Sequence, residues 1–170
     1  MHNYLGMNFD FSEKGKVIVD MIAYVKAMLD EFPIKLKDDD TAPTPAPDNL
    51  FAPSEGEDLD KSMAETHHTF TAKGLCACKR ARPDTQPAIA GLCTRVMKPT
   101  TGDWDKSLRY MKHLNGARND KLILSADDLH VIKWYVDAAF AVHPDFKSHS
   151  RGSYVFWGWR SYFRVKEAEA

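Results

Sequence analysis

Ala81-Arg82-Pro83-Asp84 lies at the centre of the stretch that decides the fold, which runs from Ser62 to Gly116. Upstream, Ser62-Met63-Ala64-Glu65 has the pattern of a capping box, in which a hydroxyl and a carboxylate three residues apart satisfy the first amides of a helix. Downstream, Asp84 is a suitable N-cap, and Pro87 falls in the first turn, where a missing N–H costs nothing. The tetrapeptide is therefore predicted to separate two helices.

A third helix is predicted to open at Pro99-Thr100 and to stop at Asn115-Gly116. Its apolar residues recur at i, i+4, i+7 and i+10, which places them on one face: Trp104, Leu108, Met111 and Leu114. Asn and Gly are the residues that most readily take the left-handed conformation that ends a helix.

The N-terminal residues predict a β-hairpin followed by an amphipathic helix. Tyr4 to Phe9 and Lys16 to Val19 flank a turn at Ser12 to Gly15. Asp20 is placed to cap a helix with one apolar face, made of Ile22, Val25, Leu29 and Phe32.

Lys35 to Asp60 predicts a disordered linker. The stretch from Asp38 to Asp60 holds eight acids and no base, and four prolines interrupt it: Pro43, Pro45, Pro47 and Pro53. Such a composition buries too little apolar surface to fold. We expect a mobile, dispensable segment without contacts to the rest of the chain.

Two strands are predicted after the helices. Lys121 to Leu124 forms a short one, Asp127-Asp128 turns the chain, and Leu129 to Phe140 forms a longer one. Trp134 and Val136 are expected on one face of that strand, with Tyr135 and Asp137 on the other. The predicted fold class is α+β.

Charge is unevenly distributed, although the net charge is only −1. Lys73 to Lys121 carries eleven bases against four acids, a surplus that suits the phosphate backbone of a nucleic acid. Solvated helix faces are the simpler explanation of such a surplus. The candidate nucleic-acid contacts are Lys79, Arg80, Arg82, Arg95, Arg109 and Lys112.

Cysteine and histidine spacing argues against a disulfide framework and against zinc. The three cysteines, Cys76, Cys78 and Cys93, are an odd count, and His67 and His68 are adjacent rather than four apart. No apolar run approaches the length of a membrane span and no signal peptide is evident, so we expect an intracellular protein of the cytoplasm or nucleus, without membrane or small-molecule partners.

An ordered series of motifs resembles the copia-type retrotransposon polyprotein, between its reverse transcriptase palm and its ribonuclease H. That family has, in order, segments of the types T-R-P-D-I, S-R-F-M, N-P-T, H-W and L-R-Y-L-K-G-T. The residues that carry the resemblance here are Gly74-Leu75, Ala81 to Asp84, Arg95-Val96-Met97, Pro99-Thr100, Trp104, Leu108 to Lys112 and Leu114-Asn115-Gly116. No single segment is specific, but their common order and spacing are.

The resemblance implies a domain organisation. It consists of the end of the palm and a thumb helix (1–36), the disordered acidic linker (37–60), a helical thumb and connection block (61–118), an incomplete ribonuclease H-like start (119–157) and a divergent tail (158–170). RNA or an RNA–DNA hybrid is the partner that it implies, bound weakly. The implied function is that of a reverse transcriptase and ribonuclease H polyprotein fragment, catalytically inert alone.

The resemblance also places one catalytic candidate. Tyr135 to Phe140 is similar to the family's Y-S-D-A-D-W, so Asp137 corresponds to its first metal-binding carboxylate, which serves Mg²⁺-dependent cleavage. Ala139 stands where the family has a second acid, and the paired polymerase aspartates would precede Tyr4. One carboxylate cannot hold two divalent ions, so we expect Asp137 to be vestigial and no Mg²⁺ to be bound.

Past Ser150 the resemblance fails, and we expect that residues 151–170 follow a frameshift; a divergent strand from Ser153 to Trp157 is the alternative. Two other functions remain open. One is a nucleic-acid-binding module that a host has retained from such an element. The other is a small enzyme that uses Asp137 with Asp145 or Asp127.

Overall fold

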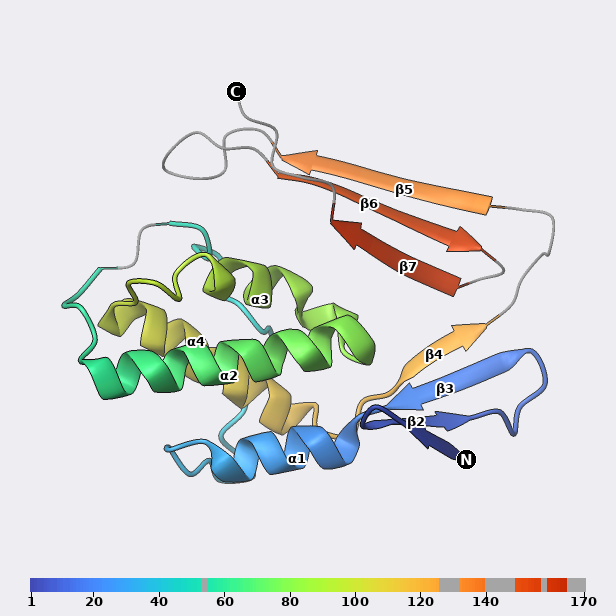
Figure 1. The fold of residues 1–170 in the computed structure, drawn as a ribbon, viewed down its shortest axis with the longest axis horizontal. Helices are drawn as coiled ribbons and strands as arrows, with labels where there is room; N and C mark the ends of the chain where they lie inside the picture. Colours follow the sequence, from blue (N-terminus) through green and yellow to red (C-terminus); the bar gives the residue numbers. More distant parts are fainter. Residues whose placement is uncertain (53–54, 126–131, 140–148, 157–158, 165–170) are drawn as a thin grey trace.

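The computed structural model describes residues 1–52, 55–125, 132–139, 149–156 and 159–164, the last three ranges as backbone strands. Within these ranges the chain forms four α-helices and two antiparallel sheets, which confirms the predicted α+β class (Figure 1). The helices follow the first three strands in the sequence and form one block beside the first sheet (Figure 1).

The first sheet has the strand order β1-β2-β3-β4, with every neighbouring pair antiparallel. Its strands are His2–Tyr4 (β1), Met7–Asp10 (β2), Lys16–Asp20 (β3) and Leu122–Ser125 (β4). The predicted hairpin is confirmed as the pair β2 and β3, but its first strand begins at Met7 and not at Tyr4, because Leu5 and Gly6 form a turn. A tighter turn at Leu5-Gly6 joins β1 to β2; its two residues have φ of 50° and 78°, as a two-residue hairpin of the primed type requires.

β4 belongs to the N-terminal sheet and not to the later strands. Its residues pair with β3 in the register Val17 to Leu124 and Val19 to Leu122, and they share an apolar cluster with Met21. The prediction grouped this strand with the unit at residues 119–157, whereas the structure pairs it with the edge of β3 in the N-terminal sheet. A four-residue apolar strand carries no signal of its own that selects its partner.

α1 spans Ile22–Glu31, and its apolar face points into the core as predicted. Val25 and Phe32 are buried, while Ile22 and Leu29 are half-buried. Met21 rather than Asp20 holds the N-cap position, although Asp20 still accepts the Ile22 amide at 3.3 Å.

α2 spans Lys61–Arg80 and begins one residue before the predicted capping box. The N-cap is Asp60, whose carboxylate accepts the Met63 amide at 2.9 Å. The predicted cap at Ser62 is therefore wrong. Asp60 lies three residues before Met63, which is the spacing that lets an N-cap side chain accept a first-turn amide, and the helix starts there.

The tetrapeptide at residues 81–84 does interrupt the helices, but Asp84 is not a cap. A 3₁₀ turn, η1 (Pro83–Thr85), leads into α3 (Gln86–Cys93), whose N-cap is Thr85. Pro87 lies in the first turn of α3 as predicted. Asp84 has another partner, described below.

α4 spans Thr101–Gly116 and opens at the position that the sequence predicted, directly after Thr100. Thr100 and Asp103 form a reciprocal capping box, with the Thr100 side chain bonded to the Asp103 amide and the Asp103 carboxylate to the Thr100 amide. The predicted left-handed stop at Asn115-Gly116 is wrong, because both residues are helical and Ala117 is the C-cap. Asn115 serves instead as a donor to another segment.

The core lies where α1, α2, α3 and α4 meet. Its largest buried members include Phe32, Met28, Ile89, Met111 and Leu114. The Phe32 ring packs edge-on against Phe70 and stacks on Trp104, with ring centroids 5.0 and 5.7 Å apart. Gly74 allows α2 and α3 to pack closely, since a Cβ there would lie 2.5 Å from Ile89 Cδ1.

The second sheet has the order β5-β6-β7, with both pairs antiparallel. Its strands are Ile132–Ala139 (β5), His149–Phe156 (β6) and Trp159–Arg164 (β7). β5 lies within the predicted long strand, whereas Asp127-Asp128 and the ends of that strand fall outside the described residues. β7 falls in the stretch that was predicted to be a divergent tail.

Residues 37–52, named here the acidic segment, form no helix or strand but lie along α4. Leu36 and Ala46 pack against the helical core, and Gly116 approaches Thr41 so closely that a Cβ would lie 3.1 Å from the Thr41 side chain. The expected linker without contacts therefore differs from the structure. The composition of the acidic segment disfavours a helix or strand, but the segment can still pack on α4, because its backbone carbonyls accept hydrogen bonds from side chains of that helix.

Candidate nucleic-acid interface

Lys79 and Arg80 lie in the last turn of α2, where positive charge interacts favourably with the helix dipole. Lys79 is exposed. The Arg80 guanidinium is half-buried, donates to the Cys76 carbonyl at 3.3 Å and lies 2.7 Å from the Cys76 Sγ. Lys79 is thus open to a phosphate, while Arg80 would give up contacts within its own helix to reach one.

Arg82 is buried, with its side chain only 3% exposed. Its Nε and one Nη donate to the two carboxylate oxygens of Asp84, at 3.0 and 2.7 Å, and its other Nη donates to the Ala117 carbonyl at 2.9 Å. Such a two-pronged pair is both strong and directional. Arg82 fastens η1 to the end of α4 and is closed to a phosphate, which removes it from the candidate interface.

Asp84 is the ionised partner in this link. Burial favours the neutral acid, but His113 and Arg82 outweigh it and hold the pKa of Asp84 well below its usual range. The His113 Nε2 lies 3.5 Å from the Asp84 carboxylate, an ion-pair distance rather than a hydrogen bond. Asp84 therefore joins η1 to α4, which explains why it does not cap α3.

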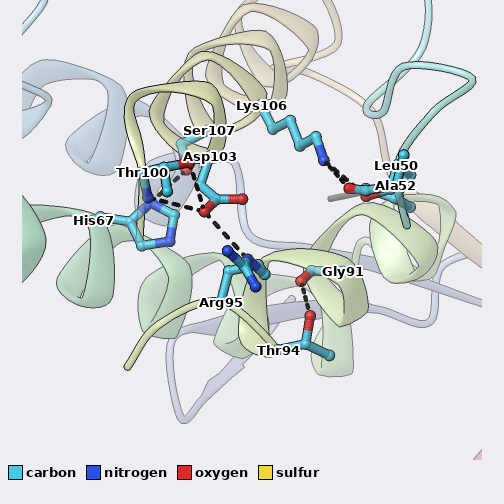
Figure 2. Close-up of polar contacts among 10 residues, drawn as sticks. All are labelled: Leu50, Ala52, His67, Gly91, Thr94, Arg95, Thr100, Asp103, Lys106 and Ser107. Carbon is cyan, nitrogen blue, oxygen red and sulfur yellow. Dashed lines mark hydrogen bonds and ion pairs between the residues drawn. The ribbon is translucent and has the colours of Figure 1, made fainter. Parts of the chain in front are cut away.

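Arg95 is tied to the fully buried Asp103 (Figure 2). The Asp103 Oδ2 accepts from the Thr100 amide at 2.9 Å, from the Thr100 hydroxyl at 3.2 Å and from the Arg95 Nε at 3.2 Å. The Arg95 side chain is 42% exposed, so its outer nitrogens remain at the surface. Arg95 nonetheless neutralises the Asp103 carboxylate, because burying that charge without a partner would be costly.

His67 and Ser107 form a buried pair beside this network (Figure 2). The Ser107 Oγ lies 3.0 Å from the His67 Nδ1. Burial lowers the pKa of His67, with a smaller opposing effect of Asp103, so the imidazole is neutral at pH 7. Ser107 is 4% exposed and His67 is not exposed at all, so the arrangement of serine, histidine and aspartate is closed to a substrate and acts in packing.

The acidic segment contacts the remaining two predicted cations. Arg109 donates to the Thr44 hydroxyl at 2.8 Å, and the Lys112 Nζ lies 3.9 Å from the Asp40 carboxylate. Lys106, one turn earlier on α4, donates to the Leu50 and Ala52 carbonyls at 3.1 and 3.2 Å (Figure 2). These cations lie together on one helix face, but a part of the same chain already lies over them.

A groove of about 810 Å³ remains between α4 and the acidic segment. Its walls carry both signs of charge: Lys106 and Arg109 are offset by Glu55 and Asp105. Mixed charge does not select a polyanion, so the groove adds no independent argument for nucleic acid.

The catalytic candidate Asp137 lies in the interior of β5, where its register partner in β6 is Arg151. A basic residue is thus its direct cross-strand neighbour, whereas a two-metal site needs further carboxylates. Asp127 and Asp145 fall outside the described residues. In the described part of the chain, no group of three or more His, Cys, Asp or Glu residues is placed to hold a metal ion.

Comparison of the chain with protein-family models, with curated proteins and with solved structures found no match. Among the helices that the structure describes, none combines the length and the apolar character needed to cross a membrane.

The sequence missed two features of this region. One is the buried group of His67, Ser107 and Asp103; the signal for it was that His67 lies three residues before Phe70 and seven before Gly74, on the buried stripe of α2. The other is the docking of the acidic segment, for which composition gives no signal, since most of its polar contacts use backbone carbonyls that any residue carries.

Proposed function

We propose that this chain derives from the junction of reverse transcriptase and ribonuclease H in a copia-type retrotransposon polyprotein, is inert as an enzyme by itself, and binds RNA or an RNA–DNA hybrid weakly. The observation that carries the proposal is the ordered motif series between Gly74 and Asp137. A nucleic-acid-binding module retained by a host is the alternative, and it shares the same binding surface.

The contacts between distant motifs support the proposal. Arg82 and Asp84 belong to one motif of the series, and they contact Ala117 and His113, the residues that directly flank Leu114-Asn115-Gly116 of another. Motifs that touch in space restrain one another's spacing, which gives a physical reason for their occurring together. The chance appearance of separate weak motifs would supply no such contact.

The exposed and half-buried basic side chains support the proposal that the chain binds nucleic acid. They are Lys79, Arg80, Arg95, Arg109 and Lys112, once the buried Arg82 is set aside. Binding through them would be dominated by phosphates and by the release of counterions, so the affinity is expected to fall steeply as salt rises.

The test is a fluorescence-anisotropy titration of the full chain with a labelled RNA–DNA hybrid at several salt concentrations. The double variant Arg109→Gln/Lys112→Gln should bind about tenfold more weakly and show a shallower salt dependence. Lys14→Gln/Lys61→Gln removes two exposed lysines elsewhere and is the matched control. Affinity that stays constant between low and physiological salt, or equal losses in both variants, would refute specific binding at α4.

The origin has a separate test in genomic DNA. Sequence that flanks this reading frame should encode, in some frame, a Y-V-D-D motif upstream and the remaining carboxylates of a ribonuclease H downstream. Flanks that encode neither would leave the host-retained module as the better explanation of the motif series.

A further inference from the structure

All five basic residues between positions 106 and 118 contact the acidic segment. They are Lys106, Arg109, Lys112, His113 and Arg118. We infer that the acidic segment is a built-in competitor of nucleic acid: it occupies the cationic face of α4 in cis, and a phosphate backbone binds there by displacing it. This inference rests on the proposed function, because it concerns the regulation of the same surface.

The contacts follow a regular order along the helix. Asp38 pairs with Arg118 at 2.8 Å, the Ala42 carbonyl lies 3.1 Å from the His113 Nδ1, and Thr44 accepts from Arg109. Leu50 and Ala52 then accept from Lys106. The segment thus runs antiparallel to α4 and covers its basic face from end to end, as an extended ligand would.

Asn115 fixes the first part of this path. Its side-chain amide donates to the Lys37 carbonyl at 2.7 Å and to the Asp40 carbonyl at 3.1 Å. Asp40 in turn accepts the Lys37 amide at 3.0 Å, which closes a turn that directs the Asp38 and Asp40 carboxylates toward Arg118 and Lys112. Two acids of the segment are therefore positioned on cations, as successive phosphates would be.

The contacts of the acidic segment with α4 are strong enough to compete with nucleic acid and weak enough for nucleic acid to displace them. The Asp38 side chain is 87% exposed and the Lys112 Nζ lies 3.9 Å from the Asp40 carboxylate, so solvent screens both ion pairs and each is weak. A polyanion presents many charges to the same face, and it gains affinity from counterion release that the tethered segment does not. The tether in turn supplies a high effective concentration, which sets the threshold for displacement.

Matched pairs of carboxamide variants test the inference. Asp38→Asn/Asp40→Asn removes the two paired acids, and the Asn at position 40 can still accept the Lys37 amide. Asp39→Asn/Asp48→Asn changes the net charge equally at two exposed acids of the same segment. The first variant should bind a labelled RNA–DNA hybrid about three- to tenfold more tightly than the original chain, while the control should change by less than about twofold.

A second measurement follows the segment itself. On addition of hybrid to the original chain, the heteronuclear NOE of backbone amides between residues 38 and 52 should fall, while that of α4 amides should stay constant. Hybrid that binds without this fall, or equal affinities of both variants and the original chain, would overturn the inference and leave the proposed binding intact. Absence of hybrid binding in all three proteins would overturn both.

Discussion

The Arg118 Nη2 lies 2.8 Å from the Asp38 Oδ1, an ion pair that joins positions eighty residues apart. It fastens the start of the acidic segment to the residue that follows the C-cap of α4. At the other end, the Thr101 and Gly102 amides at the start of α4 donate to the carbonyls of Glu57 and Glu55. The chain between α1 and α2 therefore serves both ends of α4, which makes α4 dependent on residues that resemble a linker.

Replacing residues 38–49 by a Gly/Ser stretch of equal length should lower the free energy of unfolding by about 1–3 kcal/mol. The contacts that α4 and Arg118 make to the side chains of Asp38, Asp40 and Thr44 would be lost, and each contributes up to about 1 kcal/mol. Equal length keeps the connection geometry and isolates the effect of the contacts. Urea denaturation followed by circular dichroism measures the change, and unchanged stability would restore the linker without contacts that composition predicts.

Gly74→Ala should lower the free energy of unfolding by about 1–3 kcal/mol, because the new Cβ would overlap the Ile89 side chain. Ile89→Val removes the Cδ1 that lies 2.5 Å from that Cβ position, at an ordinary cost of about 1 kcal/mol. The double variant should therefore be more stable than the sum of the two changes indicates. Strict additivity in this double-mutant cycle would show that α2 and α3 have room to separate.

The parts of the fold that follow local rules were predictable, and those that depend on a choice of partner were not. Thr100 and Asp103 are three residues apart, so the α4 cap needs no other segment, and the hairpin at residues 7–20 is equally local. β4 pairs with a strand about a hundred residues earlier, and Asp84 prefers Arg82 and His113 to a cap. The partner of β4 lies far outside any local sequence window. Arg82 is only two residues from Asp84, but its own position depends on the distant Ala117 carbonyl, which the local sequence does not reveal.

The candidate interface was predictable as a region but not residue by residue. An excess of positive charge identifies the helices, yet burial removes Arg82 and an internal carboxylate engages Arg95. This changes the design of a binding test. Charge reversal at Arg95 would leave the buried Asp103 beside a second negative charge and would damage folding, so Arg109 and Lys112 are the informative positions.

Arg82→Ala should lower the free energy of unfolding by about 2–4 kcal/mol, because it removes the buried member of an ion pair whose other member, Asp84, is half-exposed. Both the Asp84 carboxylate and the Ala117 carbonyl would lose their donor. Lys79→Ala, at an exposed position three residues earlier, should change stability by less than about 0.5 kcal/mol. Equal small effects in the two variants would refute the link between η1 and α4.

Stability should fall as the pH drops below about 6.5, because His67 is buried as the neutral imidazole. Its folded pKa is lowered, so below the ordinary value of 6.5 the unfolded chain takes up a proton that the folded chain does not. The Asp84 contribution is lost only at more acidic pH, below about 4, since the folded pKa of that group is also lowered. The two effects therefore occupy separate pH ranges.

Denaturation midpoints between pH 5 and pH 7.5 measure the histidine effect. His67→Asn should be less stable at pH 7.5 and should show a flatter pH dependence, whereas His68→Asn, at the exposed neighbouring position, should keep the original slope. Parallel slopes for the two variants would assign the pH dependence to other groups.

The chain should not cleave the RNA strand of an RNA–DNA hybrid. Cleavage by a ribonuclease H needs several carboxylates around two metal ions, and Asp137 is the only one that the motif series matches in these 170 residues. Its register partner in β6 is Arg151 and not an acid, and a lone carboxylate binds Mg²⁺ weakly because that ion gives up its waters reluctantly. Purified chain and the Asp137→Asn variant are incubated with labelled hybrid and Mg²⁺ or Mn²⁺. Cleavage that the substitution abolishes would contradict the proposed inertness and would require that other acids, from this chain or from a second copy, complete the site.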